Sequence, residues 1–309
     1  MTDRILDIAE SGAYLHVRGL LLCIQPPAPE NAPDQSPPPP EVTIPLKELA
    51  AVILTHPRVT CTRTVLSGLA EAGAIVVACD DHFTPVAMML PLTGYHAPAR
   101  RMAAQADAGA PIRKRLWQQI VTAKVLAQAA ALREVRGDDF GLTQLAGQVR
   151  SGDPENIEGQ AARVYWPALF DSAEFLRNTA AVDQNRFLNY GYAVLRAAVA
   201  RAICASGLHP GLGLHHHHRN NAFCLADDLM EPFRPLIDRV VIELVGEGRA
   251  DEVLDKKIKS RLIAPVMARY RIGDEQRTLF DILARLTASV AAAFENPAAH
   301  SRLDLPAVE

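Results

Sequence analysis

The chain has 309 residues, of which 49 % are hydrophobic, so it can bury a core in each of two ordinary domains. It opens MTDRILDIAE, without a basic segment followed by an apolar one, and no stretch approaches the roughly 20 apolar residues of a membrane span. Its five cysteines are scattered and never spaced as C-x-x-C, which argues against a disulfide framework and a zinc ribbon. We therefore expect a soluble, cytoplasmic protein with no membrane partner.

The net charge of −3 is distributed unevenly along the chain. Residues 93–150 hold nine basic and four acidic side chains, whereas residues 1–92 hold five basic and ten acidic ones. Through such a block, a chain with a negative total can still present a basic surface to phosphates. A solvated helix surface accounts for the same composition, so charge alone leaves nucleic-acid binding open.

The first part of the chain has the pattern of a small β-rich domain, which we place at residues 1–92. Alternating or β-branched runs predict strands, and one apolar helical pattern ends at Gly73, a typical helix stop. The expected strands lie within residues 14–24 and at 52–54, 75–78 and 85–90, and the expected helix spans 65–72.

Residues 26–41, PPAPENAPDQSPPPPE, contain eight prolines. Proline cannot donate to a sheet ladder, so we expect an extended, solvated loop inserted between two strands. A ligand for a proline-binding module is the alternative interpretation of such a tract.

Helical spacing dominates after a turn-rich segment, PLTGYHAPA, in which residues 93–99 are the expected linker. An all-α domain is expected at 100–295, and residues 296–309 have too few apolar side chains to be more than a mobile tail. The expected helices are 113–136, 159–169, 183–205, 225–245, 250–268 and 278–295. The predicted fold class is α+β, with a small N-terminal β-rich domain followed by a larger all-α domain.

Four consecutive histidines, His215–His218, stand about a dozen residues before the acids Asp228 and Glu231. Acids three residues apart share one face of a helix, so these two are expected to point together. Imidazole and carboxylate ligands suit Mn²⁺ or Zn²⁺, whereas Mg²⁺ prefers oxygen ligands. Because consecutive side chains diverge, only one or two of the histidines can face one ion. A polar loop that caps a helix is the structural alternative.

Glu158 stands in a second polar segment, ENIEGQAARVYWPALF, just before a run of small residues. Ala161 and Ala162 permit close approach of another backbone. An acid near a helix N-terminus is also explained by the helix dipole alone, so the pattern leaves the role of Glu158 open.

Three long strings resemble one known family: IEGQAARVYW (157–166), FLNYGYAVLRAAVARAICASGLHPGLGLHHHH (187–218) and NAFCLADDLMEPFRPLIDRVV (221–241). They resemble the CRISPR-associated spacer-acquisition integrases, the first Cas family, and are most similar to members from type II systems. The resemblance covers nearly the whole chain and implies a small N-terminal β domain and a larger all-α catalytic domain. The proline-rich segment is not part of the family's pattern.

The resemblance implies that Glu158, His216 and Glu231 bind a catalytic divalent ion, Mg²⁺ or Mn²⁺, with Asp228 as an accessory acid near the ion or the DNA. It also implies a reaction in which the 3′-OH ends of short DNA fragments are joined to the repeat of a CRISPR array by phosphodiester transesterification. In that chemistry the ion offsets charge on the phosphate, and the protein needs no covalent nucleophile.

The implied partners are DNA, a second copy of the chain and a small second Cas protein. The resemblance implies a homodimer, which we expect to form through the N-terminal β domain, and a hetero-hexamer in which a dimer of the small protein bridges two such dimers. Backbone contacts to DNA are expected from Arg113, Lys114, Arg115, Arg163, Arg219, Lys256, Lys257, Lys259 and Arg261.

Two other functions use the same residues. A stand-alone, structure-selective DNA nuclease has the same site, with water in place of the 3′-OH. A DNA-binding assembly subunit with a structural ion in the histidine cluster is the non-enzymatic alternative, although structural zinc sites favour cysteine ligands.

Overall fold

The computed structural model of the chain describes residues 4–28, 39–80, 85–91, 97–178, 181 and 183–306. The chain forms two compact units, Met1–Gly94 and Tyr95–Glu309. The first is rich in strands and the second consists mostly of helices, which is the α+β arrangement that the sequence predicts.

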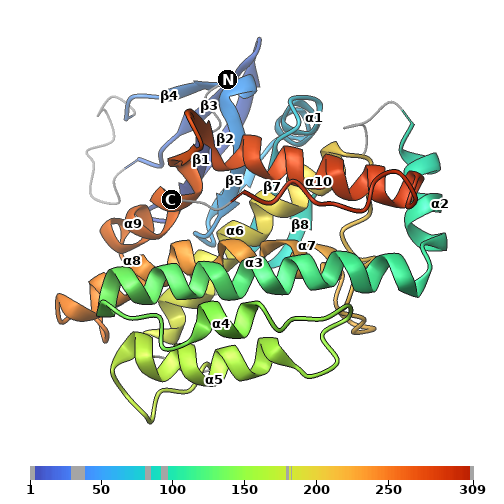
Figure 1. Ribbon diagram of the computed structural model, residues 1–309. Coiled ribbons are helices and arrows are strands. Elements are labelled where there is room, and N and C mark those ends of the chain that lie inside the picture. Colours follow the sequence, from blue (N-terminus) through green and yellow to red (C-terminus); the bar gives the residue numbers. More distant parts are fainter. Residues whose placement is uncertain are drawn as a thin grey trace. The chain divides into compact units, whose positions relative to one another are not determined.

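In its described residues, the first unit contains two four-stranded sheets, one α-helix and a 3-10 turn at Leu46–Glu48 (Figure 1). The strands are β1 (Arg4–Ile8), β2 (Ala13–Arg18), β3 (Leu21–Gln25), β4 (Val42–Pro45), β5 (Leu49–Leu54), β6 (Val59–Cys61), β7 (Ile75–Cys79) and β8 (Pro85–Met89), and the helix is α1 (Arg63–Glu71). One sheet has the order β1-β5-β7-β8, in which only β8 is antiparallel to its neighbour. The other has the order β4-β3-β2-β6, in which only β6 is parallel to its neighbour.

The sheets and α1 bury one apolar core. Leu15 and Leu22 of the second sheet, Val52 of the first and Leu69 of α1 are at most 1 % exposed. Side chains alternate along a strand, so β2 directs Leu15 into this core and His16 to the opposite face.

The strands expected within residues 14–24 and at 52–54, 75–78 and 85–90 are present, whereas β1, β4 and β6 were not predicted. Strands of three to five residues are too short to show a clear period of two. The proline-rich segment, predicted as an inserted loop, lies between β3 and β4, which pair with each other. Its residues 29–38 lie outside the described part of the chain, as do residue 92 and residues 93–96 of the predicted linker.

The second unit is built around one long helix. Its helices are α2 (Pro98–Asp107), α3 (Ala110–Arg136), α4 (Leu142–Ala146), α5 (Ile157–Phe170), α6 (Asn185–Ala205), α7 (Cys224–Met230), α8 (Arg234–Gly246), α9 (Lys256–Met267) and α10 (Leu279–Glu295). Helix α3 crosses the unit, with α4 and α5 on one side and α10 on the other (Figure 1). Leu116, Ile120 and Val125 of α3 are fully buried. None of the helices in the described ranges combines the length and apolar character that a bilayer crossing needs.

Two elements of this unit differ from the all-α prediction. A β-hairpin of β9 (Arg269–Ile272) and β10 (Glu275–Thr278) precedes α10, and it turns at Gly273, which has a φ of +60°. Residues 225–245, predicted as one helix, form α7, a 3-10 turn at Glu231–Phe233 and then α8. Pro232 and Pro235 cause the break, because neither can donate the backbone hydrogen bond of a continuous helix.

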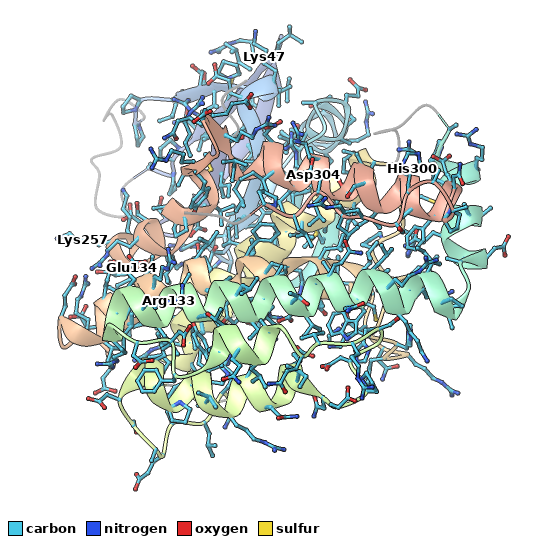
Figure 2. All side chains as sticks on the ribbon, in the orientation of Figure 1. Lys47, Arg133, Glu134, Lys257, His300 and Asp304 are labelled. Atoms are coloured by element: carbon cyan, nitrogen blue, oxygen red, sulfur yellow. The ribbon has the colours of Figure 1, made fainter. Side chains whose placement is uncertain are left out.

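Residues 296–306 are fastened to the helices, in contrast to the mobile tail that we expected. Gln119 on α3 accepts a hydrogen bond from the backbone N of Leu303 at 2.9 Å, and Leu303 is 6 % exposed. Asp304 forms an ion pair with Arg285 Nε at 2.8 Å beside α10 (Figure 2). One buried leucine and a few polar contacts are sufficient to hold the segment, and composition does not reveal them.

Candidate metal centre

Glu158 lies in the first turn of α5, whose start is fixed by two caps. The Asp153 carboxylate accepts hydrogen bonds from the backbone N of Ile157 at 2.8 Å and of Glu158 at 3.0 Å. Asn156 Oδ1 accepts one from Gly159 N at 3.1 Å. These acceptors satisfy N–H groups that have no partner within the helix. The position of Glu158 therefore follows from local sequence.

Glu231 lies where the chain breaks between α7 and α8, and it is 4 % exposed. Arg234, one turn later, donates Nε–H to Glu231 Oε1 at 2.8 Å. The guanidinium of Arg234 also lies over the ring of Tyr192, 4.5 Å from the ring centroid. The arginine thus holds the Glu231 carboxylate from one side.

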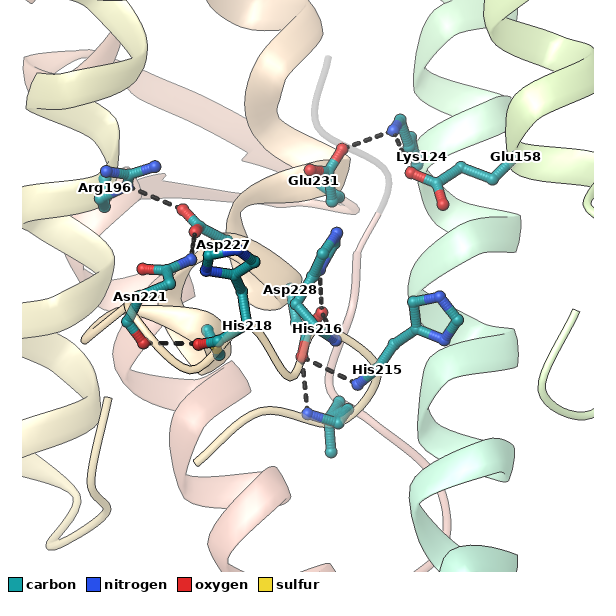
Figure 3. A network of polar contacts seen from close by, with 12 residues as sticks. Lys124, Glu158, Arg196, His215, His216, His218, Asn221, Asp227, Asp228 and Glu231 are labelled. Atoms are coloured by element: carbon teal, nitrogen blue, oxygen red, sulfur yellow. Dashed lines mark hydrogen bonds and ion pairs between the residues drawn. The ribbon is translucent and has the colours of Figure 1, made fainter. Parts of the chain in front are cut away.

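The ammonium group of Lys124, on α3, lies between the two carboxylates (Figure 3). Its Nζ is 2.6 Å from Glu158 Oε1 and 2.5 Å from Glu231 Oε2. Burial lowers the pKa of Lys124, but the charges of Glu231 and Glu158 outweigh burial and hold the pKa above its ordinary value. Two carboxylates from different helices therefore converge on one positive charge.

Glu231 is ionised in this environment. Burial raises its pKa, but Arg234 and Lys124 outweigh burial and lower the pKa to about 2 from an ordinary value of 4.5. The stability that follows from this shift is present above the ordinary pKa and is lost as the pH falls towards 2. The carboxylate is thus available to a cation throughout the neutral range.

Asp228 organises the histidine segment. It is fully buried, and its carboxylate accepts hydrogen bonds from the backbone N of Leu214 at 2.6 Å, of His215 at 3.1 Å and of His216 at 3.3 Å. Charge-assisted bonds of this kind are stronger than bonds between neutral groups. One carboxylate therefore fixes the path of three consecutive residues.

The same carboxylate orients the ring of His216, whose Nδ1 lies 2.6 Å from Asp228 Oδ1. An ionised carboxylate only accepts, so Nδ1 carries the hydrogen, and Nε2 of the neutral ring keeps its lone pair. The hydrogen bond to Asp228 raises the pKa of His216 against the effect of burial, and the charges of Asp228, Glu231 and Glu158 raise it further. Figure 3 shows His216 on the side of Asp228 that faces Glu231 and Lys124. The ring thus lies within the field of both carboxylates.

The four adjacent histidines have different surroundings. His215 stacks on Trp117, with ring centroids 4.4 Å apart and planes 4° apart, and His216 meets the same indole edge-on at 5.8 Å. His217 and His218 are exposed. Of these four, only His216 has the ring contact with Asp228 among the interactions described.

A second buried polar cluster adjoins this region. Asp238 on α8 is 1 % exposed and accepts hydrogen bonds from the hydroxyls of Tyr165, at 2.8 Å, and Tyr192. Burial raises the pKa of Asp238 to about 6, against the lowering effect of the two tyrosine bonds. The cluster joins α5, α6 and α8.

We expect Asp238 to make the stability of the chain depend on pH. Its pKa in the folded state, about 6, exceeds the ordinary value of 3.8, so its contribution is fully present below 3.8 and is lost as the pH rises through 6. Relative to Asp238→Asn, the free energy of unfolding of the parent chain should fall by roughly 2 kcal/mol between about pH 4 and pH 7. Urea unfolding of both proteins across this range measures the difference. Parallel pH profiles would show that the carboxyl is already ionised when folded.

The residues expected to contact DNA are not all at the surface. Those that are exposed are Lys114, Arg115, Arg163, Arg219, Lys256 and Lys257, and Arg113 is half-buried. The prediction is wrong for Lys259, which is 4 % exposed because it lies on the buried face of α9 beside Ile258 and Leu262, with its Nζ 5.6 Å from the centroid of the Tyr190 ring. Arg261 is paired with Glu247 at 2.6 Å and Glu243 at 3.0 Å.

The structure brings Glu158 and Glu231 together at Lys124, and it pairs His216 with Asp228 where the charges of both glutamates act on the His216 ring. Sequence reasoning did not identify Lys124 or Arg234. No local sequence signal marks Lys124, and only the structure shows that its side chain is 12 % exposed.

Known proteins resemble this chain over most of its length. A family profile described as CRISPR associated protein Cas1 matches residues 6–262. The CRISPR-associated endonuclease Cas1 of Neisseria meningitidis serogroup C (strain 8013) is 42 % identical over 255 residues, which are 81 % of each chain.

Two solved structures share the fold. A casposase bound to integration product has a TM-score of 0.74 at 20 % identity, covering 95 % of this chain and 91 % of the casposase chain. A chain of a Cas6-RT-Cas1–Cas2 complex has a TM-score of 0.72 at 19 % identity, covering 97 % of this chain and 36 % of that one.

Proposed function

The chain belongs to the CRISPR-associated Cas1 family, and on this premise we propose that it is a metal-dependent DNA integrase and endonuclease of CRISPR adaptation. It joins the 3′-OH ends of short DNA fragments to the repeat of a CRISPR array. The observation that carries the proposal is the convergence of Glu158 and Glu231 on one positive charge beside the His216 ring.

The donor types suit one divalent ion, although the ligand atoms of Glu158, His216 and Glu231 do not all lie within 4.8 Å of one another and would have to close around it. The Lys124 ammonium is a stand-in cation that marks where the carboxylates of Glu158 and Glu231 meet. His216 adds Nε2, and histidines that bind metals commonly donate their other ring N–H to a carboxylate, as His216 does to Asp228. Two carboxylates and one imidazole are compatible with Mg²⁺ or Mn²⁺. When bound, such an ion offsets charge on the phosphate and lowers the pKa of the attacking hydroxyl.

In this scheme the side chains of the protein hold the ion and orient its ligands, and they form no covalent intermediate. The 3′-OH of the fragment gives up its proton to solvent as its oxygen attacks a phosphorus of the repeat in line. A new P–O bond forms, and the bond to the 3′-oxygen of the repeat breaks as that oxygen takes up a proton from solvent. Glu158, Glu231 and His216 would hold the ion, and Asp228 keeps the His216 ring in place. Arg234 keeps Glu231 ionised.

Gly213 permits the close fit of the histidine segment. A Cβ at this position would lie 2.4 Å from His216 O and 2.9 Å from Asp228 Oδ2. We expect Gly213→Ala to displace His216 and to weaken Mn²⁺ binding about tenfold or more. Calorimetric titration with Mn²⁺ measures this, and Gly246→Ala is the matched control, since a Cβ there meets nothing within 4 Å. Equal affinities of Gly213→Ala and the parent chain would contradict the tight fit.

Affinity for duplex DNA is expected to fall steeply with salt despite the negative net charge. Lys114 and Arg115 are exposed at the start of α3, within the basic block, and neutralisation of about six phosphates predicts a loss of roughly a thousandfold between 50 and 200 mM salt. The double variant Lys114→Ala/Arg115→Ala should have a shallower dependence, whereas Lys47→Ala, in the first unit, should not. A flat dependence for the parent chain would show that the block is only solvated surface. Fluorescence anisotropy with a labelled duplex gives each slope.

We also propose that the chain forms a homodimer through its first unit and a hetero-hexamer with a small second Cas protein. The edge strands β1 and β8 of one sheet and β4 and β6 of the other give this unit surfaces for pairing. A complex whose name includes both Cas1 and Cas2 contains a chain of this fold, which supports the second part. Sedimentation at micromolar concentration, alone and with the small protein, distinguishes monomer, dimer and hexamer.

Integration into a supercoiled plasmid that carries a repeat array tests the function directly. A labelled short duplex should become covalently joined to the plasmid when Mn²⁺ or Mg²⁺ and the small partner are present. Nicking or branch cleavage without joining would favour the stand-alone nuclease, which uses the same ligands with water as nucleophile.

A further inference from the structure

Three metal-binding side chains meet on the first unit, outside the site described above. His16 on β2 and Cys23 on β3 are opposite each other in the antiparallel pairing. Thr43 on β4 is paired with Cys23, and Glu41, two residues earlier, belongs to the same face of the sheet. One ring nitrogen of His16, Cys23 Sγ and one carboxylate oxygen of Glu41 all lie within 4.8 Å of one another.

The surroundings of this cluster favour a bound ligand. The cluster is on the face of the sheet opposite the apolar core, yet Cys23 is fully buried, and the side chains of His16 and Glu41 are only 27 % and 21 % exposed. His16 Nδ1 is buried and has no hydrogen-bond partner within the described ranges. A buried polar atom without a hydrogen-bond partner is uncommon in native proteins, which suggests that a ligand interacts with this histidine.

We propose that His16, Cys23 and Glu41 bind a divalent transition-metal ion of the Zn²⁺ type. Thiolate, imidazole and carboxylate are the three ligand types of protein zinc sites, and a thiolate disfavours Mg²⁺. Tetrahedral zinc with bonds of about 2.0–2.3 Å places its ligand atoms roughly 3.5 Å apart, so the three groups need to close by about 1 Å. The fourth position is left to water.

Glu41 can bind the ion and keep its ion pair with Arg18. Its Oε1 accepts a hydrogen bond from Arg18 at 2.6 Å, while Oε2 faces His16 Nε2 at 3.3 Å. A carboxylate has two oxygens with separate acceptor sites, so one can remain with the guanidinium while the other binds the metal. Arg18 then also offsets part of the negative charge of a site that contains thiolate and carboxylate.

The position of the cluster gives the ion a structural role. Cys23 precedes the proline-rich segment and Glu41 is its last residue, so an ion bound to both cross-links the chain on either side of residues 26–38. Gln25 already links the same two sides by donating Nε2–H to Pro39 O at 2.9 Å. An ion that binds only the folded arrangement stabilises it by mass action. The site uses residues of the first unit alone, and it is independent of the proposed catalytic function.

Titration of the reduced, metal-free, full-length chain with Co²⁺ tests the proposal, because thiolate ligation produces a charge-transfer absorption in the near ultraviolet. We expect one equivalent of Co²⁺ to produce this band, and Zn²⁺ to abolish it and to raise Tm. Cys23→Ser should lose the band, and Glu41→Gln and His16→Ala should weaken Co²⁺ binding at least tenfold. The ion proposed for Glu158, His216 and Glu231 has no sulfur ligand, so it cannot supply the band.

Two variants serve as matched controls. Cys61→Ser changes a thiol of the same sheet that packs against the apolar core, and Cys224→Ser changes the thiol nearest the histidine segment; both should keep the band. Absence of the band in the parent chain, or its survival in Cys23→Ser, would overturn the proposal. If Cys23→Ser fails to fold, Glu41→Gln decides the matter, since an unchanged Co²⁺ affinity in that variant also contradicts the site.

Discussion

Replacing His216 with alanine is expected to lower the rate of strand joining by about a thousandfold or more, which corresponds to several kcal/mol of transition-state stabilisation. The expectation follows from the ring's position, held by Asp228 within the field of Glu158 and Glu231. Glu158→Ala should have a similar effect. Initial rates of plasmid integration with Mn²⁺, at matched protein concentrations, measure the loss.

The neighbouring histidines provide the controls. His217→Ala and His218→Ala change exposed residues, so their rates should match the parent chain and their unfolding free energies should stay within about half a kcal/mol of it. His215→Ala removes the stacking on Trp117 and should have an intermediate effect. Normal joining by His216→Ala, with His217→Ala or His218→Ala inactive instead, would place the ligand at another position in the run.

Asp228→Asn is expected to weaken Mn²⁺ binding 10- to 100-fold, the usual effect of removing the partner of a metal-binding histidine. Asparagine retains one oxygen for the backbone N–H groups of Leu214 and His215, but its NH2 group, in the place of Oδ1, cannot accept a hydrogen bond from His216 Nδ1–H. Calorimetry with Mn²⁺ gives the affinity. Saturating Mn²⁺ should restore most of the joining rate, because the ligands themselves are unchanged.

Two outcomes separate positioning from direct ligation by Asp228. If Asp228 itself binds the ion, Asp228→Asn should lose as much activity as Glu158→Ala, and excess Mn²⁺ should not restore it. If Asp228 has neither role, its substitution should affect stability alone, through the buried N–H of Leu214, and leave Mn²⁺ affinity unchanged.

The sequence was sufficient for the division into a strand-rich and a helical part, because periodicity and composition change together near residue 92. The sequence did not reveal the helix break at Pro232. Asp228 and Glu231 are three residues apart, a spacing that one continuous helix also accommodates. The 3-10 turn separates their tasks: Asp228 holds the histidine segment, and Glu231 faces Lys124.

Residues that act through tertiary contacts were the hardest to predict. Lys124 is 34 positions from Glu158 in sequence, and within α3 it has the pattern of an ordinary helix lysine. His16 and Cys23 form no spaced motif, and only the pairing of β2 with β3 brings them together. Lys259 was predicted to contact DNA but is buried. The basic run at the start of α9 gave no indication of which lysine faces the interior.

The central claim is that Glu158, Glu231 and His216 share one divalent ion. Anomalous diffraction from crystals of the chain soaked in Mn²⁺ tests it most directly. We predict a manganese peak bonded to a carboxylate oxygen of Glu158, a carboxylate oxygen of Glu231 and Nε2 of His216, with Nδ1 still hydrogen-bonded to Asp228. A saturated crystal with no peak among these three side chains would contradict the account.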